Sequence, residues 1–135
     1  MASYIDTSFL LAIAQGESGI TDLLPLWEND HHRFSSRLLW AECTVTLRRG
    51  NADPVQAEAA RRLLSGVNAL ELTKSIVDRL DTDTRFSKCR TLDAIHLATA
   101  LELAGHAEDL VVISLDRRMR MVASLFSLMV LPREV

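Results

Sequence analysis

Short apolar runs alternate along the chain with longer stretches in which apolar residues recur at helical spacing. The runs predict five strands, at residues 4–5, 33–35, 69–72, 110–114 and 128–131. Residues 110–114 give the strongest signal, because they are almost continuously apolar, mostly β-branched and flanked by polar residues. This pattern is typical of a parallel strand buried on both faces.

Helices are predicted between the strands. They cover residues 9–14, 21–29, 36–49, 54–65, 75–83, 90–100 and 117–126. Asp53 followed by Pro54 is a typical helix start, Thr91 is the expected N-cap of the helix at 90–100, and Gly16, Gly50 and Gly105 are expected stops. The alternation predicts one α/β domain spanning residues 1–135, with a central parallel sheet of four to five strands and helices on both faces.

Composition narrows the class of protein. The chain has 135 residues, of which 48% are hydrophobic and 24% charged, so we expect one globular domain with a single core. No apolar run approaches the roughly 18 residues of a membrane span. Asp6 interrupts the N-terminal apolar residues, so we expect no signal peptide and no membrane association. Cys43 and Cys89 are expected as reduced thiols in a cytoplasmic protein. The net charge of −3 gives no overall signature of nucleic-acid binding.

Four acids occupy unusual positions in this pattern. Asp6 and Asp116 each end a predicted strand, and carboxyl ends of neighbouring parallel strands meet at one edge of a sheet. Glu42 lies on the apolar ridge of its helix, and Asp93 lies in the first turn of a helix that is apolar on nearly all sides. Acids are rarely buried unless they are paired or bind a metal. The pattern therefore indicates a cluster of carboxylates at the sheet edge.

Such a cluster is expensive without a cation. At about 5 Å and an effective dielectric constant near 20, each pair of carboxylates repels by roughly 3 kcal/mol. A set of hard oxygen ligands removes this repulsion by binding Mg²⁺ or Mn²⁺. The sequence thus favours a metal site formed by Asp6, Glu42, Asp93 and Asp116, with Glu42 either a ligand or the base that orients water.

Simpler explanations exist for single residues. Asp6 could be only an N-cap, and Asp93 could only complement the helix dipole. His96 lies three residues after Asp93, so a contact that supports the site is one alternative, but we expect a packed or half-exposed histidine. His31, His32, His106 and the cysteines lack zinc spacing, and no nucleophile-elbow sequence supports a hydrolase triad.

The chain resembles the PIN-domain ribonucleases, and most closely the VapC toxins of toxin–antitoxin pairs. The resemblance follows the family's motif order over essentially the whole chain. It rests on residues 4–8 (YIDTS), 40–42 (WAE), 91–98 (TLDAIHLA) and 113–119 (ISLDRRM). Asp6, Glu42, Asp93 and Asp116 match the family's acids, and Ser8 and Ser114 match hydroxyl positions that commonly support them.

The resemblance implies a toxin that cuts single-stranded regions of RNA, with tRNA and rRNA as candidate targets, using Mg²⁺ or Mn²⁺. It also implies a homodimer and a VapB-like antitoxin whose C-terminal segment covers the active site. Cations that flank two of the acids are candidates for phosphate contacts to RNA. They are Arg85, Lys88, Arg90, Arg117 and Arg118, with Arg120 beside them.

Two other functions remain open. A catalytically silent PIN module could serve as an RNA-binding or protein-interaction scaffold, although the complete set of four acids argues against it. A structure-specific DNA nuclease of the flap type is the other alternative, but the short chain has no room for the helical arch that such enzymes use.

Overall fold

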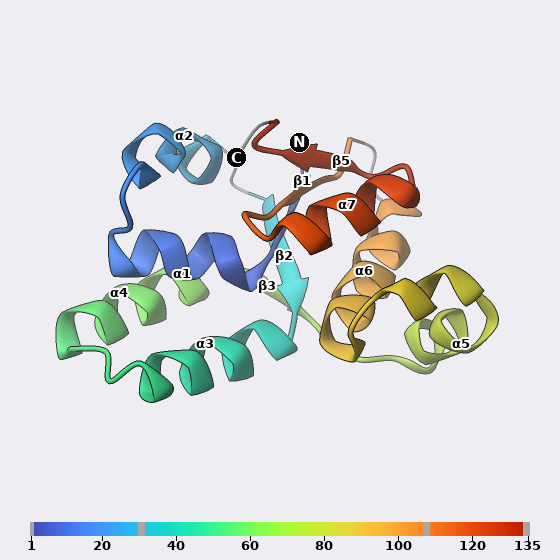
Figure 1. The fold of residues 1–135 in the computed structure, drawn as a ribbon, viewed down its shortest axis with the longest axis horizontal. Helices are drawn as coiled ribbons and strands as arrows, with labels where there is room; N and C mark the ends of the chain where they lie inside the picture. Colours follow the sequence, from blue (N-terminus) through green and yellow to red (C-terminus); the bar gives the residue numbers. More distant parts are fainter. Residues whose placement is uncertain (1, 30–31, 107–108, 134–135) are drawn as a thin grey trace.

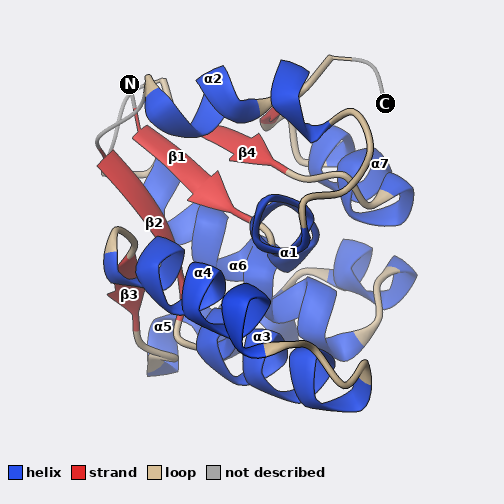
Figure 2. Cartoon of the chain, turned by 90° about the vertical axis from the view of Figure 1, so that its left-hand side faces the viewer, coloured by secondary structure: helices blue, strands red, loops and turns tan. Residues whose placement is uncertain are grey.

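A computed structural model describes residues 2–29, 32–106 and 109–133. Its centre is a five-stranded sheet in the order β3-β2-β1-β4-β5, in which every neighbouring pair is parallel (Figure 2). The strands are β1 Ala2–Ile5, β2 His32–Ser36, β3 Asn68–Leu70, β4 Val111–Ile113 and β5 Met129–Leu131. The predicted fold class, a parallel α/β sheet of four to five strands, is confirmed.

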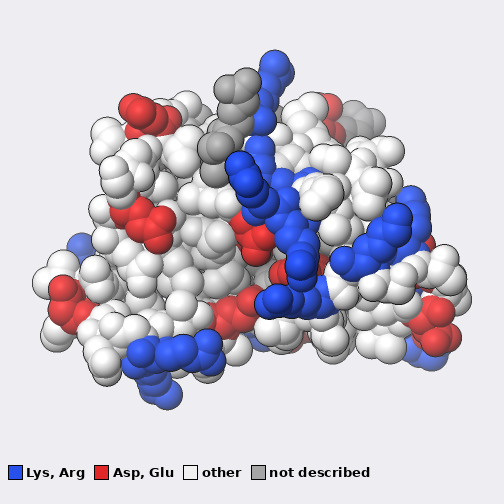
Figure 3. All heavy atoms as spheres, viewed as in Figure 1, with Lys and Arg blue, Asp and Glu red and all other residues white. Residues whose placement is uncertain are grey.

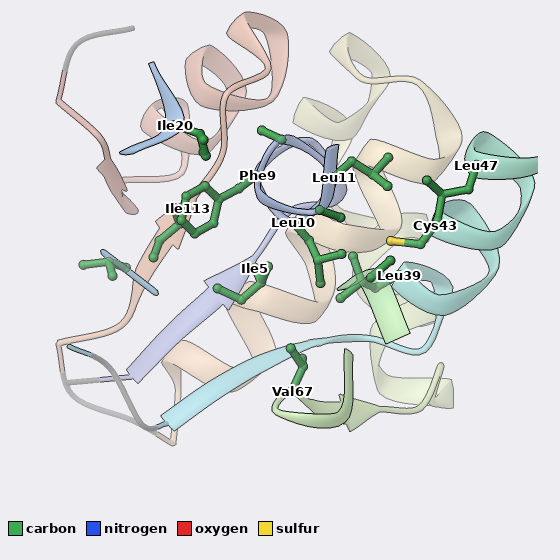
Figure 4. Close-up of a cluster of buried hydrophobic side chains, with 14 residues drawn as sticks. Ile5, Phe9, Leu10, Leu11, Ile20, Leu39, Cys43, Leu47, Val67 and Ile113 are labelled. Carbon is green, nitrogen blue, oxygen red and sulfur yellow. The ribbon is translucent and has the colours of Figure 1, made fainter. Parts of the chain in front are cut away.

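Helices cover both faces of this sheet (Figure 1). The helices are α1 Thr7–Gln15, α2 Leu24–Glu28, α3 Leu38–Arg49, α4 Pro54–Ser65, α5 Lys74–Thr82, α6 Thr91–Ala104 and α7 Arg117–Leu125, with short 3-10 helices at Ile20–Asp22 and Thr84–Lys88. Along β1 and β4 the side chains alternate between two cores. Ile5 and Ile113 pack with α1, α3 and α4 in one core (Figure 4). Tyr4 and Val112 lie in the other, against α6.

The strand order creates a crevice at one edge of the sheet. The chain runs from β1 outward to β2 and β3, and later returns to place β4 and β5 on the other side of β1. In open α/β sheets the carboxyl ends of the two strands at this reversal form the usual ligand site. Here those strands are β1 and β4; Asp6 directly follows β1, and Asp116 lies just beyond the end of β4, at the start of α7.

Several predicted boundaries differ from the structure, and four of the differences have a clear local description. The helix expected at residues 21–29 is divided into the 3-10 helix Ile20–Asp22 and α2, because Pro25 has no N–H and must lie in a first helical turn. The helix expected from Ser36 begins at Leu38, since β2 continues through Ser36. Arg90, and not Thr91, is the N-cap of α6. The strand expected at residues 69–72 is Asn68–Leu70.

Other expectations can be compared directly with the fold. Asp53 caps α4 as predicted, because its side chain accepts the N–H of Gln56 at 2.8 Å. Both thiols are unpaired, Cys43 buried and Cys89 partly exposed. Across the described ranges, no helix has the length and apolar character needed to cross a membrane.

Candidate active site

Asp6 is the most buried of the four acids, with 5% of its surface exposed. Its Oδ2 accepts two hydroxyl hydrogen bonds, from Ser8 at 2.6 Å and from Ser114 at 2.7 Å. Asp6 occupies the N-cap position of α1, yet its side chain makes no capping hydrogen bond. Helix capping therefore does not explain this carboxylate, whereas the predicted association with Ser8 and Ser114 is present.

Ser114 also connects Asp6 to Asp116. Its fully buried hydroxyl donates to Asp6 and accepts the backbone N–H of Asp116 at 3.1 Å. The Asp116 side chain lies at the start of α7, where Oδ1 accepts the N–H groups of Arg118 at 2.8 Å and Met119 at 3.2 Å. Asp116 is thus a helix cap as well as a neighbour of Asp6, and its exposed carboxylate keeps a second oxygen.

Glu42 is held from two sides. Its Oε1 accepts the hydroxyl of Thr7 at 3.1 Å and forms a short hydrogen bond with Nε2 of His96. The other ring nitrogen, Nδ1, lies 2.7 Å from the hydroxyl of Tyr4, which in turn accepts the N–H of Ser36 at 3.0 Å. His96 and Tyr4 are each 1% exposed. The Glu42 side chain is 23% exposed, so it lies at the boundary between this buried chain and solvent.

The expectation for His96 is therefore wrong in one respect. The ring is packed, but it also contacts the site, and its partner is Glu42 rather than Asp93. Burial alone would lower the pKa of His96, but the hydrogen bond and the charge of Glu42 outweigh it and raise that pKa. Of the other histidines named in the sequence, His31 lies outside the described residues.

Asp93 shows that the four acids are close enough to interact. Burial raises the pKa of this partly exposed carboxyl, and the charges of Asp6, Asp116 and Glu42 raise it further. The charges of these acids also affect the pKa of the two thiols. Burial, followed by the charges of Glu42 and Asp6, raises the pKa of Cys43 to about 12. Burial and the charge of Asp93 raise the pKa of Cys89.

The donor atoms suit a hard cation, but they do not form a closed cage. In the part of the chain that the structure describes, no three Asp, Glu, His or Cys side chains form a group that could hold a metal ion by themselves. Mg²⁺ does not require such a cage, since it usually keeps several waters and binds one or two carboxylates. The second oxygens of Asp6, Glu42 and Asp116, together with Asp93, are suitable ligands of this kind.

Cations flank the acids, as the sequence indicated. In Figure 3, Asp and Glu side chains gather near the centre of one face, beside a band of Lys and Arg that passes over the start of α7. Lys88, Arg90, Arg117 and Arg118 are exposed. Arg85 is instead paired with Asp83 at 2.6 Å and lies 4.2 Å from the ring centre of Phe126.

Arg120 differs from its neighbours in the sequence. Its guanidinium donates to the carbonyl of Ser114 at 2.8 Å and to the carbonyl of Pro132. These bonds join the end of β4 to the chain that follows β5. Arg120 therefore supports the fold beside the site, which makes it a poor candidate for contact with RNA.

Sequence reasoning missed the roles of Thr7 and Tyr4 beside the site, and it considered a supporting contact of His96 without favouring it. Thr7 directly follows Asp6, and nothing in its local pattern indicated a contact with Glu42, which is 35 residues away. Tyr4 and His96 could have been suspected, because both are polar side chains within stretches predicted to be buried. Their mutual contact depends on the packing of α6 against β1, which a single sequence does not reveal.

Comparisons with known proteins identify the family and the fold. The family model for the PIN domain matches residues 3–125. The chain is 35% identical to ribonuclease VapC46 of Mycobacterium tuberculosis over 103 residues, which is 76% of each chain. Among solved structures, a toxin–antitoxin complex from Klebsiella pneumoniae matches with a TM-score of 0.65 and 23% identity, over 85% of this chain and 87% of that one.

VapBC2 from Rickettsia felis, bound to a DNA fragment from its promoter, matches with a TM-score of 0.69 and 11% identity. The match covers 96% of this chain and 97% of the other. At these identities the two structures support the fold alone. The family model and the curated relative establish the family.

Proposed function

The chain belongs to the PIN-domain family, as a VapC-like member, and from that premise we propose that it is a Mg²⁺- or Mn²⁺-dependent endoribonuclease acting as a cytoplasmic toxin. Its substrate is a single-stranded region of RNA. The observation that carries the proposal is the grouping of Asp6, Glu42, Asp93 and Asp116 at the edge of the sheet where β1 and β4 end, with the pKa of Asp93 raised by burial and, in addition, by the charges of the other three.

Each acid has a role in this proposal. Asp6, Asp93 and Asp116 hold the metal, which, when bound, lowers the pKa of water and stabilises charge on the phosphate. Glu42 is a further ligand or the base that orients the attacking water. Its Oε1 is engaged by Thr7 and His96, so Oε2 is the atom available for this task. The hydroxyls of Ser8 and Ser114 keep Asp6 in place.

The cations at the rim of the site can bind the phosphates of the substrate. Lys88, Arg90, Arg117 and Arg118 are exposed beside the acids and can contact phosphates on either side of the cleaved bond. Phosphate contacts position a nucleic-acid strand without reading its sequence, so this rim leaves the target sequence open. Arg85 can contribute only by giving up part of its pairing with Asp83.

Cleavage of a single-stranded RNA by the purified protein tests the proposal. Cleavage should require Mg²⁺ or Mn²⁺ and stop in excess EDTA. Asp6→Asn, purified in parallel, controls for contaminating nucleases and should be inactive. Undiminished cleavage in EDTA by the wild type, or equal cleavage by Asp6→Asn, would contradict metal-dependent catalysis at this site.

We also propose a VapB-like antitoxin partner and a homodimer. The support for a partner comes from the matched Klebsiella and Rickettsia structures, which are toxin–antitoxin complexes. An acidic pocket is best blocked by an arginine, whose fork can bridge two carboxylates. A complex in which the four acids stay open to solvent would contradict inhibition of this type.

The alternative is a catalytically silent PIN module that binds RNA or protein. One observation favours it: within the described residues no group of three ligands is arranged to hold a metal. One measurement separates the two functions, because a silent module binds RNA but cleaves it neither in EDTA nor in Mg²⁺.

A further inference from the structure

A buried chain of hydrogen bonds links the backbone of β2 to Glu42. The N–H of Ser36 donates to the hydroxyl of Tyr4, that hydroxyl contacts Nδ1 of His96, and Nε2 of His96 contacts Oε1 of Glu42. Tyr4 comes from β1, His96 from α6 and Glu42 from α3. Three elements of the fold therefore meet at one carboxylate.

The direction of these bonds follows from the donors available. In a neutral ring only one nitrogen carries a proton. The Tyr4 oxygen accepts from Ser36 and can donate its own proton to Nδ1, which leaves the ring proton on Nε2. In a charged ring both nitrogens carry protons. In either state Nε2–H donates to Glu42, so this bond does not depend on whether the ring is charged.

This arrangement fixes which oxygen of Glu42 can act. Oε1 accepts from both Thr7 and His96, and the two donors come from different helices. A carboxylate held by two donors at one oxygen has little rotational freedom, and its second oxygen points away from them. The ring itself is 1% exposed and cannot reach RNA. His96 can influence the reaction only through Glu42.

We propose that His96 is a positioning residue that, aligned by Tyr4, holds Glu42 so that Oε2 faces the metal and the attacking water. This inference rests on the proposed function. A histidine that merely fills the core would leave catalysis unchanged when replaced by a residue of similar size. A positioning histidine requires a donor at the place of Nε2.

Two substitutions separate these roles. The amide nitrogen of His96→Gln can occupy the place of Nε2, whereas that of His96→Asn can reach only the place of Nδ1, toward Tyr4. Loss of a group that orients a ligand typically costs about 10–100-fold in activity. We expect His96→Asn to lose kcat by this factor with little change in KM for RNA, and His96→Gln to recover most of the loss.

Leu97→Ala is the matched control, because Leu97 is 1% exposed on the same helix and packs among apolar residues, so it has no group that could donate a hydrogen bond to Glu42. It should lower the melting temperature and leave kcat within about threefold at a temperature where it is folded. If His96→Asn and His96→Gln lose kcat equally, or if His96→Asn cleaves like Leu97→Ala, His96 is structural and the proposal is wrong.

A second measurement needs no catalysis. In the metal-free protein, NMR of ¹⁵N-labelled histidine should show a slowly exchanging Nε2–H that shifts or is lost in Glu42→Ala. His106→Gln, a change at an exposed histidine, should leave that resonance in place. A resonance unaffected by Glu42→Ala would overturn the inference. If the wild type fails to cleave RNA while this resonance behaves as expected, the proposed function fails and the contact with Glu42 stands.

Discussion

The four acids fall into an inner pair and an outer pair that the fold treats differently. Asp6 and Glu42 form the inner pair, and each accepts hydrogen bonds at one oxygen from two side chains. Asp93 and Asp116 form the outer pair, on the first turn and the N-cap of two helices. Asp116 accepts only from backbone N–H groups of α7. Among the described residues Asp93 accepts no hydrogen bond, and burial and neighbouring charges raise its pKa.

This difference shows which of the four carboxylates is most affected by the electrostatic repulsion within the cluster. Hydroxyl and imidazole donors fix the orientation of the inner carboxylates. Asp93 accepts no such hydrogen bond within the described residues. Burial and the charges of Asp6, Asp116 and Glu42 raise its pKa, and the charge of His96 offsets only part of this. The carboxylates of the inner pair are held in a fixed orientation even when no cation is bound. The outer pair adds negative charge that a bound cation would neutralise.

The largest expected effect is on catalysis by Asp6→Asn. If Asp6 holds the metal, loss of its charge removes several kcal/mol of transition-state stabilisation, which is a decrease of roughly 100- to 1000-fold in kcat/KM. Asn still accepts the hydroxyls of Ser8 and Ser114, but as a neutral group, so its metal-free stability should stay level or fall by about 1 kcal/mol. RNA cleavage and thermal melts in EDTA measure both. A clear gain in stability would remove the distinction between the pairs.

Ser114→Ala tests whether the inner pair depends on its donors. The buried hydroxyl joins Asp6 to the N–H of Asp116, so its removal leaves the buried Asp6 carboxylate and that N–H each short of a partner. The free energy of unfolding should fall by about 1–3 kcal/mol. Ser124→Ala is the control, since Ser124 is exposed and bonds only to a carbonyl of its own helix. Similar small losses in both variants would show that Ser114 does not hold the pair.

The inner and outer pairs also differ in how far sequence could predict them. The positions of Asp6 and Asp116 followed from local pattern, because each ends an apolar strand and parallel strands bring their carboxyl ends to one edge. Ser8 and Ser114 were expected beside them. Asp93 was identified by its place in an otherwise apolar helix. The sheet, with its strands in a confirmed parallel arrangement, was predictable for the same reason.

The partners of Glu42 were not predictable. Thr7 and His96 are 35 and 54 residues away from it, and their contact depends on how α1, α3 and α6 pack around β1. The boundaries that failed are also cases in which longer-range structure overrides local preference. By sequence, Ser36 is a reasonable helix start. In the structure, Ser36 lies opposite Leu70 in the pairing of β2 with β3, so it belongs to β2.

The cations beside the site also divide into those with a side-chain partner and those without one. Arg85 is paired with Asp83, whereas within the described ranges Arg117 and Arg118 make no ion pair. Replacing Arg117 and Arg118 with alanine should reduce the salt dependence of RNA binding by about 0.7 unit of log–log slope per lost phosphate contact. Arg85→Ala, the comparison variant, should change the slope less. An unchanged slope in the double variant, measured from low to moderate salt, would show that these cations do not contact RNA.

The smallest effect, and the most direct test of the comparison, is the stability of metal-free Asp93→Asn. Because the folded-state pKa of Asp93 is raised, the folded protein binds more protons than the unfolded chain between the ordinary value of 3.8 and the raised value. The free energy of unfolding of the wild type should therefore fall as pH rises through that window, and the loss is complete above the raised pKa.

Asn cannot ionise, so the variant should lack this fall and be more stable than the wild type at neutral pH. Asp93 is partly exposed, and solvent screening limits the gain to about 1 kcal/mol or less. Mg²⁺ should reverse the order, since it stabilises the form that binds it and the variant binds it less well. Melts of both proteins from pH 4 to 8, with EDTA and with Mg²⁺, check this. If Asp93 only complements the helix dipole, the variant is less stable than the wild type at neutral pH in both conditions.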